Sequence, residues 1–579
     1  MNMKLSLQAV LLTVGMTASA QQVATSYKSV NNGNPISASV FCADPTAIDY
    51  NGRLYVYGSN DHQQFKANNK KGDNGYGAIK SLVVFSTDDM VNWTFHGTID
   101  VGKLCSSWGW QFSNSWAPSA VWRTTAAGKD EFFVYFANGG GSVGVLKSTE
   151  SPVGPFTSPR TNPMITGSTA GVSPCNWVFD PGVVIDSTGT AWIGFGGGDP
   201  NNQGNDLQPN NARFAKLATS MTSISGKAVK IPAPYHFEAS ELNIMDGKFV
   251  YTYCSSWRGR NDWSKYQKEH NITVGAPGTC TMCYMVSDNP MDPNSWVYKG
   301  DYGPHPGSSP NNHSHLHKFQ GNYYHIYHNG ALLQNMKNAN GVDNSAGGYR
   351  SICVNKATVN ESTQKINKVT LNNSGVSAIK NLDPYILQQA ETMATCGGVT
   401  YDNFTNITKK TNINSLGNDA SQNMQVKMNA GAWTMVRKAD FGEDGPGSFM
   451  LRAKGTGVLE IRLGSQTAKP AARLEFSSTA FEDHILDIDT TAFTGVKSVF
   501  FVFTEAKNVQ FDAWQFQEKL ANDIHHVSPN AQHPSSTTTT RRFDLSGRQL
   551  PNTRKQHGLV IEQRTDANGV KTSRKRAVK

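Results

Sequence analysis

The chain has 579 residues, more than one hydrophobic core usually organises, so two or more domains are expected. Only 17% of the residues are charged, whereas Gly, Asn, Ser, Thr and aromatic residues are abundant, which is typical of many short strands joined by turns. The formal net charge is +9, but residues 541–579 contain eleven Lys/Arg and three Asp/Glu, so the rest is nearly neutral. This balance argues against a basic face for nucleic acid on the folded body.

The first twenty residues have the pattern of a signal peptide. Lys4 precedes an apolar stretch over residues 5–16, and Ala18-Ser19-Ala20 is a small-residue cleavage site. A membrane anchor is disfavoured because the apolar run is too short and is interrupted by polar residues. We therefore expect cleavage after Ala20, a secreted, periplasmic or cell-surface protein, and no transmembrane segment.

Between residues 40 and 330 one pattern occurs five times: a strand-like run, a tight polar turn with a glycine, and a second strand rich in aromatic residues. Each copy is a β-hairpin signal. The spacing of the turns, roughly 60 to 75 residues, fits one four-stranded blade with a long loop, so the chain is predicted to be all-β and to begin with a five-bladed β-propeller. A β-sandwich is the alternative, but five spaced copies of one hairpin are unusual there. The turn glycines are Gly52, Gly128, Gly189, Gly247 and Gly321.

Residues 351–388 are expected to form a connecting segment that closes the propeller, and a second all-β unit is expected after it. Apolar strand-like runs at 433–437, 457–463 and 499–503 show no long helical period, and they predict a small β-sandwich (jelly roll) over residues 389–517. A linker and a basic tail are expected over residues 530–579, around a low-complexity Ser/Thr run.

Eight cysteines are scattered along the chain. Cys280 and Cys283 form a lone CxxC pair, and without a second pair at metal-ligand spacing they do not predict a zinc site. In an exported protein, buried thiols or one or two disulfides are the expected states.

Three carboxylates occupy matching places in the hairpin pattern. Asp44 precedes the first hairpin, Asp180 precedes the third and Glu238 precedes the fourth. The innermost strands of a propeller line its central channel and enter from one end, so the three acids are expected to converge there. A single Asp-Pro is more often a turn former, but three acids in matching positions indicate a site.

Hydrolysis of a glycosidic bond needs such a set of acids. One carboxylate activates water and a second protonates the leaving oxygen, and a separation of roughly 6.5–9.5 Å leaves room for the water in an inverting enzyme. A third carboxylate can keep the pKa of the acid high by like-charge repulsion.

The segments Ala43-Asp44-Pro-Thr, Trp116-Ala-Pro-Ser, Phe179-Asp180-Pro-Gly, Phe237-Glu238-Ala-Ser and Asn311-Asn-His313 resemble glycoside hydrolase family 43, in the right order. The resemblance covers about residues 33–385 and implies a five-bladed propeller that cleaves with inversion and needs no cofactor for its chemistry.

By this resemblance Asp44 is the general base, Glu238 the general acid, and Asp180 the residue that tunes the pKa of the acid and orients it. Glu241 is the rival candidate for the acid. The distance along the chain from Glu238 to the Asp246-Gly247 turn matches the family better, so Glu238 is preferred.

Three further residues are candidates for substrate binding. Trp116 would form a wall of the sugar subsite, with a core tryptophan as the alternative. His313 resembles the channel histidine of family members that hold a calcium or other cation beneath the site, and a structural histidine is the alternative. Arg350 resembles an arginine that reaches into the pocket, where it binds sugar hydroxyls or orients a carboxylate.

The second unit, from Gln389 to the segment around Asp512, resembles a family 6 carbohydrate-binding module. The resemblance implies structural Ca2+ held by Glu391 and Asp512. Gln389 replaces the usual acid, and residues 480–490 lack the tryptophan that such modules often carry. Sugar binding and a purely architectural role therefore both stay open.

The family resemblance implies an α-L-arabinofuranosidase that releases arabinose from arabinoxylan or arabinan. β-Xylosidase and endo-acting xylanase or arabinanase are alternatives, and a non-catalytic surface glycan-binding protein is the alternative of another class. The expected partner is plant cell-wall polysaccharide, including xylan oligosaccharides, and the expected state is a monomer. The tail motif over residues 542–548 resembles sorting segments of secreted polysaccharide-degrading enzymes, with a disordered basic extension as the alternative.

Overall fold

The structure is a computed structural model that describes residues 23–199, 206–258, 260–407 and 420–519 and four strands between residues 539 and 578. The chain divides into two compact units, Met1–Lys519 and Leu520–Lys579, which are described separately. The expected signal peptide and Ser/Thr linker lie largely outside the described residues. Within the described part, no helix is long and apolar enough to cross a membrane.

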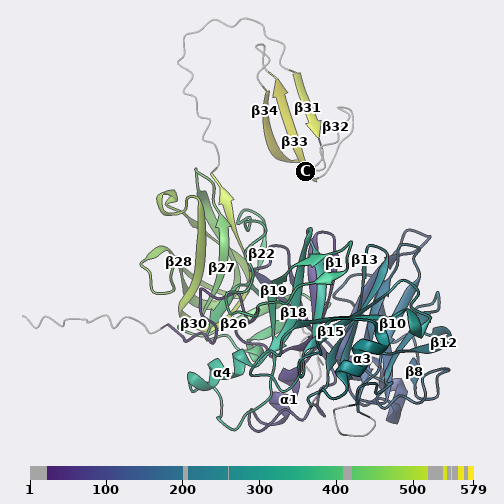
Figure 1. Ribbon diagram of the computed structural model, residues 1–579. Coiled ribbons are helices and arrows are strands. Elements are labelled where there is room, and N and C mark those ends of the chain that lie inside the picture. The colour runs from purple at the N-terminus through teal and green to yellow at the C-terminus, as the bar shows by residue number, and fades with distance from the viewer. Residues whose placement is uncertain are drawn as a thin grey trace, which may run out of the picture. The chain divides into compact units, whose positions relative to one another are not determined.

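Five antiparallel sheets follow one another along residues 43–357 and form the five blades of a β-propeller, which confirms the fold predicted from the repeated hairpins (Figure 1). The first two blades comprise β1 (Ala43–Tyr50), β2 (Arg53–Ser59), β3 (Leu82–Thr87), β4 (Trp93–Ile99), β5 (Trp116–Thr124), β6 (Asp130–Asn138), β7 (Ser142–Ser148) and β8 (Ile165–Thr166). The other three comprise β9 (Gly182–Ile185), β10 (Ala191–Phe195), β11 (Ala212–Leu217), β12 (Ile224–Ile231), β13 (His236–Met245), β14 (Lys248–Ser255), β15 (Met282–Ser287), β16 (Val297–Gly303), β17 (Ser314–Phe319), β18 (Asn322–Asn329) and β19 (Ser351–Ala357).

The tight turns expected between the first two strands of each blade are present. Between β1 and β2, Asn51 and Gly52 have φ values of 49° and 76°, and between β13 and β14, Asp246 and Gly247 have φ values of 48° and 74°. Positive φ at both central residues is the type I′ conformation, whose twist matches that of the flanking strands. The Asn-Gly and Asp-Gly pairs therefore fix the register of these hairpins.

The first strands of the five blades surround the centre of the propeller. β1 contacts β5 and β17, β9 contacts β5 and β13, and β13 contacts β17, so the five strands close a ring. The residues at the starts of several of these strands contact one another, as described below. The five strands therefore enter the ring from the same end.

The segment before β1 closes the propeller. The fifth blade has three strands, and the N–H groups of Ile36 and Cys42 donate to the carbonyls of Ile352 and Arg350, both at 2.9 Å, along the outer strand β19. Because this segment continues directly into β1, it joins the last blade to the first. The prediction that residues 351–388 close the propeller is wrong, since residues 351–357 form the third strand of the last blade.

The described helices are short and lie in the loops. α1 (Asp61–Ala67) joins β2 to β3 and begins at Asn60, whose side chain accepts a hydrogen bond from the N–H of Gln63 at 3.2 Å. Such a cap satisfies an amide that the first helical turn leaves unpaired. The others are α2 (Val101–Leu104), η1 (Ser106–Gln111), α3 (Trp263–His270), η2 (Pro293–Ser295) and α4 (Ala331–Asn338).

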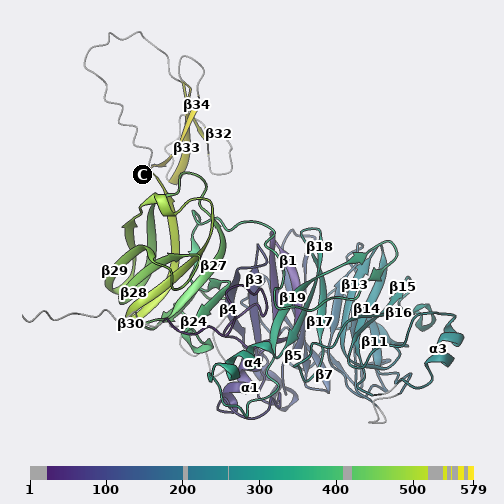
Figure 2. The same ribbon diagram turned by 60° about the vertical axis from the view of Figure 1, so that its left-hand side comes forward.

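The second domain is a curled antiparallel sheet, as the predicted β-sandwich requires (Figure 2). Its longest strand, β30 (Val496–Glu518), pairs with β22, β26, β27 and β28. Trp514 is buried in the main core of the domain, whereas Trp433 is buried in a separate cluster against the N-terminal Val23 and Val30. The other elements here are β22 (Gln388–Gln389), β24 (Thr395–Gly397), η3 (Tyr401–Asn403), β25 (Phe404–Asn406), β26 (Met424–Met428), β27 (Trp433–Asp440), β28 (Pro446–Leu463), β29 (Pro470–Asp487) and η4 (Thr490–Ala492). A small hairpin, β20 (Val359–Asn360) and β21 (Lys365–Ile366), precedes them.

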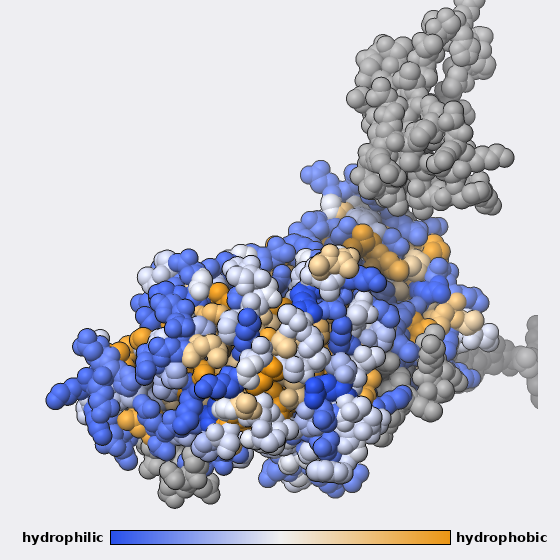
Figure 3. All heavy atoms as spheres, turned by 90° about the vertical axis from the view of Figure 1, so that its right-hand side faces the viewer, coloured by the Kyte–Doolittle hydropathy of each residue, from blue (hydrophilic) through white to orange (hydrophobic). Residues whose placement is uncertain are grey.

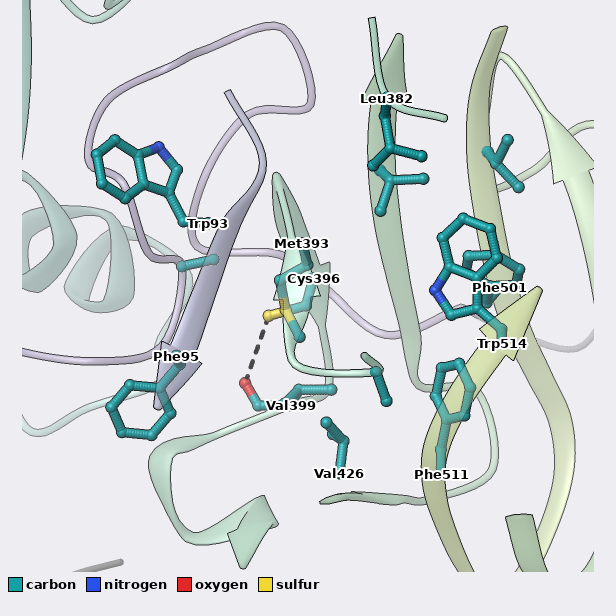
Figure 4. Packing of buried hydrophobic residues seen from close by; sticks show 14 of the residues in the cluster. Trp93, Phe95, Leu382, Met393, Cys396, Val399, Val426, Phe501, Phe511 and Trp514 are labelled. Carbon is teal, nitrogen blue, oxygen red and sulfur yellow. Dashed lines mark hydrogen bonds between the residues drawn. The ribbon is translucent and has the colours of Figure 1, made fainter. Parts of the chain in front are cut away.

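The two domains share a sheet and a hydrophobic core. β23 (Thr392–Met393) adds a fifth strand to the first blade, with Met393 opposite Trp93 of β4. Figure 4 shows the cluster around this boundary, with Trp93 and Phe95 from the blade and Met393, Val426 and Trp514 from the second domain. Burial of one continuous apolar surface stabilises the propeller and the second domain as one body.

The unit formed by the C-terminal tail is an antiparallel sheet of β31 (Thr539–Phe543), β32 (Gln549–Leu550), β33 (Gly558–Thr565) and β34 (Lys571–Val578). The sequence analysis predicted no strands in this basic region. The apolar run at residues 559–561, which lies in β33, was a strand signal that the high charge obscured.

All eight cysteines are free, and all but Cys175 are buried. Of the two states expected from the sequence, buried thiols and disulfides, the structure has thiols.

On the face shown in Figure 3, hydrophilic and near-neutral side chains predominate and hydrophobic ones form small groups. This mixture matches a chain rich in Gly, Ser, Thr and Asn and poor in charge.

Candidate active site

Each of the five innermost strands presents one of the predicted site residues where it enters the channel. Asp44 is the second residue of β1, Trp116 is the first of β5, and Glu238 is the third of β13. Asp180 and His313 stand two residues and one residue before β9 and β17. The structure therefore brings residues from five distant segments to equivalent places around one axis.

The backbone at these entries departs from regular strand geometry. Asp44 and Asp180 have φ values of 49° and 45°, and Ala117 and Ala239, which follow Trp116 and Glu238, have φ values of 38° and 63°. The strand register also shifts at the starts of β1, β5 and β13. Left-handed conformations at non-glycine residues are strained and concentrate at functional sites, where bulges re-aim side chains. Nothing in the sequence signalled these bulges.

Asp44 is buried in a set of hydrogen bonds. Its Oδ1 accepts from Arg350 Nη1 at 2.7 Å, its Oδ2 accepts from the Ser59 hydroxyl at 2.7 Å, and its N–H donates to His328 Nδ1 at 3.0 Å. Burial by itself raises the pKa of Asp44, but the Arg350 charge, His328, His313 and Ser59 outweigh it and hold that pKa at about 2. Asp44 is therefore ionised at any ordinary pH.

Arg350 is held in turn by Asp61, a residue that the sequence analysis did not single out. Asp61 accepts from Arg350 Nε at 2.9 Å and from Nη2 at 2.8 Å, and also from the backbone N–H of Arg350 at 2.9 Å. Both side chains are buried. The only local signal for Asp61 was its place after an N-cap residue, which does not predict a partner 289 residues away.

Asp180 lies near Asp44, with His313 between them. His313 Nδ1 is 3.8 Å from Asp44 Oδ1 and 3.9 Å from Asp180 Oδ2. Asp180 Oδ2 also accepts from the N–H of Ala239, next to Glu238, at 2.8 Å. Burial raises the pKa of Asp180 to about 8; the hydrogen bond from Ala239 opposes this rise and the charge of Asp44 adds to it.

Glu238 is half-buried at the entry of β13. Its buried Oε1 has no hydrogen-bond partner among the described residues. Burial, followed by the charges of Asp180 and Asp44, raises the pKa of Glu238 well above the usual range of a carboxyl group, and the Arg350 charge only partly opposes this. Glu238 is therefore protonated under conditions in which Asp44 is ionised.

Glu241, the rival acid, lies in a different environment. Its side chain is fully buried, and its Oε2 is 3.2 Å from His315 Nδ1. Burial raises the pKa of Glu241 well above its usual range, and the charge of Glu241 adds to the raised pKa of Asp180. The register shift between them places Glu238 and Glu241 opposite Cys254 and Thr252, two residues apart on β14, so both acids lie on one face of the sheet. Glu238 is the one whose pKa the charges of both Asp180 and Asp44 raise.

Trp116 is half-buried beside Tyr76, which the sequence analysis did not identify. Trp116 Nε1 donates to the carbonyl of Tyr76 at 3.2 Å, and the two rings meet edge to face with centroids 6.4 Å apart. The Tyr76 ring also lies 5.1 Å from the Arg350 guanidinium.

Burial of His313 lowers its pKa to about 4, so its ring is neutral near pH 6.

Glu391 and Asp512 were predicted as calcium ligands in the second domain, and the charge of Asp512 adds to the raised pKa of Glu391. Glu391 is buried with its Oε2 unpartnered, and the buried Oε1 of Gln389 is unpartnered as well, within the described part of the chain. Asp512 is adjacent, since its carbonyl accepts from the N–H of Ala390 at 2.9 Å, although its carboxylate is also bound to Arg452. Orphaned carboxylate and amide oxygens are the ligands that Ca2+ prefers. Among the described residues, no group of three or more His, Cys, Asp or Glu side chains could hold a metal, in the channel or elsewhere.

Comparison with known proteins agrees with this site. Residues 32–361 match the model of glycosyl hydrolases family 43, and residues 389–518 match that of the carbohydrate binding module of family 6. The chain belongs to glycosyl hydrolase family 43. This family 43 enzyme is therefore a glycoside hydrolase that inverts configuration and needs no cofactor for its chemistry, as the sequence predicted, and the alternative of a non-catalytic glycan-binding protein is set aside.

Relatives of this family 43 enzyme align along most of its length. It is 35% identical over 529 residues to the arabinoxylan arabinofuranohydrolase of Bacillus subtilis (strain 168), covering 87% of this chain and 96% of that protein. It is 35% identical over 506 residues to the arabinoxylan arabinofuranohydrolase of Paenibacillus polymyxa, covering 84% and 74%. A crystal structure of a family 43 arabinoxylan arabinofuranohydrolase from Bacillus subtilis in complex with cellotetraose superposes with a TM-score of 0.74 at 34% identity, covering 86% and 99%.

Proposed function

We propose that this family 43 enzyme is an α-L-arabinofuranosidase that removes arabinose side groups from arabinoxylan or arabinan, with Asp44 as general base and Glu238 as general acid. The observation that carries the assignment of roles is the opposite perturbation of the two acids. Arg350 keeps the pKa of Asp44 at about 2, whereas burial and like charge keep the pKa of Glu238 high. Two carboxyl groups with pKa values driven apart are the usual arrangement for a base and an acid that work together.

In the proposed reaction, ionised Asp44 accepts a proton from a water molecule as the water attacks the anomeric carbon. Protonated Glu238 gives its proton to the glycosidic oxygen as the bond to the sugar breaks, and the product has inverted configuration. Asp44 ends protonated and Glu238 ends ionised, and exchange with solvent restores both. His313 is neutral near pH 6, so it does not compete with Glu238 as the proton donor.

Asp180 is assigned to tuning and orienting the acid. Its charge, which Asp180 gains as the pH rises through its own pKa of about 8, is the second cause, after burial, that raises the pKa of Glu238. Its Oδ2 accepts from the N–H of Ala239, and this bond fixes the backbone directly after Glu238. Asp180 therefore acts on Glu238 in two ways, through its charge and through the hydrogen bond that fixes the adjacent backbone.

Substrate contacts are assigned to the aromatic and cationic groups around the acids. Trp116 is placed to stack on a sugar ring, because its ring is half-buried at the entry of β5. Arg350 and His313 lie within 4 Å of Asp44 and are assigned to sugar hydroxyls as well as to orienting that carboxylate. The partner is plant cell-wall polysaccharide.

Arabinose is favoured as the released sugar by the names of the two aligned relatives. The test is to incubate the purified protein with arabinoxylan, arabinan and xylo-oligosaccharides and to identify the sugars released. Free arabinose alone supports the proposal. Xylose from xylobiose would instead favour a β-xylosidase, and oligosaccharides from an unbranched backbone would favour endo-acting xylanase or arabinanase activity.

The protein is further proposed to be exported after cleavage behind Ala20, to act as a monomer in degradation of xylan outside the cytoplasm, and to hold Ca2+ at Glu391 and Asp512. The signal-peptide pattern supports export, and the unpartnered oxygens of Gln389 and Glu391 support the cation. Mass spectrometry of the protein recovered from culture would give the mature N-terminus. Light scattering would give the oligomeric state.

A further inference from the structure

The second domain contacts the catalytic propeller at helix α1, which carries Asp61. Tyr401, the first residue of η3, stacks on His62, with ring centroids 4.1 Å apart and an angle of 14° between the planes. His62 is buried and is also stacked on Phe41, which lies three residues before Asp44. The second domain therefore covers one side of the residue that follows Asp61.

Two more contacts join η3 to the same helix. Lys66, in the last turn of α1, donates to Asp402 at 2.6 Å, and its Nζ lies 5.6 Å from the centroid of the Tyr401 ring. Asn60, the cap of α1, lies 3.4 Å from the Tyr401 hydroxyl through its Nδ2. Tyr401 and Asp402 thus reach both ends of the helix.

Helix α1 is linked in turn to Asp44, the proposed general base. Asp61 binds Nε and Nη2 of Arg350, and Nη1 of the same guanidinium binds Asp44 Oδ1 at 2.7 Å. Because a guanidinium group is planar and rigid, the position of Asp61 sets the direction in which Nη1 points. A shift of α1 would therefore move the donor that orients Asp44.

We propose that the second domain positions the general base: Tyr401 clamps helix α1, and Asp61 on that helix holds Arg350 against Asp44. Asp61 and Tyr401 are positioning residues, and neither touches substrate. The role gives the carbohydrate-binding module a part in catalysis that does not depend on its binding sugar. It rests on the proposed role of Asp44.

The proposal is tested with 4-nitrophenyl α-L-arabinofuranoside, a small substrate whose hydrolysis does not call on sugar binding by the second domain. Tyr401→Ala in the full chain is expected to lower kcat about tenfold with KM within about twofold, because small misplacements of catalytic groups cost rate rather than affinity. Tyr401→Phe keeps the stacked ring and should keep kcat near the wild-type value. Circular dichroism verifies that each variant is folded at the assay temperature.

Met393→Ala is the matched control for damage to the domain boundary. Met393 packs in the same interdomain core, opposite Trp93, but it makes none of the contacts to α1 described above. This variant should lower the melting temperature and leave kcat unchanged. Equal values of kcat for Tyr401→Ala and Met393→Ala would overturn the proposal.

A double-mutant cycle tests the route through Asp61. If Tyr401 acts through Asp61, then Tyr401→Ala should lower kcat in the wild-type protein but cause no further loss in an Asp61→Asn background. Losses that simply multiply would overturn the proposal. Asp44→Asn, measured alongside, separates the two claims, because it must be inactive for the base assignment to stand, whereas Tyr401→Ala must retain partial activity.

Discussion

Arg350 donates a 2.7 Å hydrogen bond from Nη1 to Oδ1 of Asp44 in a buried site. The guanidinium is the largest of the influences that oppose the effect of burial on the pKa of Asp44. The negative charge of Asp44 at low pH therefore depends on an arginine that lies 306 residues further along the chain. The activity of the enzyme at low pH depends on the same contact.

Replacing Arg350 with glutamine, which removes the positive charge, should therefore move the acidic limb of the pH–rate profile. The wild-type pKa of about 2 for Asp44 keeps the base ionised down to low pH. Without the guanidinium contact that pKa rises, so kcat/KM should begin to fall at a higher pH as the solution is acidified. A profile between pH 3 and pH 7 measures this, and an unshifted limb would show that Arg350 does not set the charge of the base.

Asp180→Asn should move the alkaline limb in the opposite sense. The pKa of Asp180 is about 8, so Asp180 gains its charge as the pH rises through that value, and this charge then raises the pKa of Glu238. Asparagine cannot gain the charge, so the pKa of Glu238 is lower in the variant over this range. The acid then loses its proton at a lower pH, and kcat should fall earlier as the pH rises. An alkaline limb that stays in place or moves upward in this variant would contradict the tuning role of Asp180.

The fold was readable from the sequence because short polar turns interrupt its strands at regular spacing. The Asn51-Gly52 pair predicts a type I′ turn, and five hairpins at regular spacing predict five blades. The acids were found because each stands at the entry of a blade, within the first three residues of its first strand or just before it. The interdomain pairing of β23 with β4 was not found, since two short strands far apart in the chain carry no mutual signal.

The side chains that surround the acids could not be predicted from the sequence. Asp61 holds Arg350 through hydrogen bonds. Ser59 and Tyr76 come from the same long connection and its preceding strand. The choice between Glu238 and Glu241 depends on which of them lies near both Asp44 and Asp180, and only the structure reveals this. Contacts of this kind arise from ring closure of the propeller, which no local pattern encodes.

Calcium should stabilise the protein through Glu391. Burial, and then the charge of Asp512, raises the pKa of Glu391 well above its usual range. A carboxyl group with a raised pKa in the folded state contributes stability below its unfolded pKa and loses that contribution as the pH rises through the folded pKa. In a chelator the melting temperature should therefore be lower at pH 8 than at pH 5.

Added Ca2+ should raise the melting temperature at pH 8, by binding the ionised carboxylate in the folded state; a concentration about 100 times the Kd corresponds to roughly 2.7 kcal/mol. Glu391→Gln is the matched variant, since it keeps the shape and removes the charge. Its melting temperature should not respond to Ca2+. An equal rise in melting temperature in both proteins would show that Ca2+ binds at another site.

The most direct test of the central claim, that Asp44 is the base and Glu238 the acid, compares two leaving groups. A 4-nitrophenolate leaves without help from an acid, whereas a sugar hydroxyl needs a proton, and general acid catalysis contributes roughly 10²–10⁴-fold. Glu238→Gln should therefore lose about that factor on arabinoxylan and much less on 4-nitrophenyl α-L-arabinofuranoside, while Asp44→Asn loses activity on both. Equal losses of Glu238→Gln on both substrates, or the same split in Glu241→Gln instead, would contradict the account.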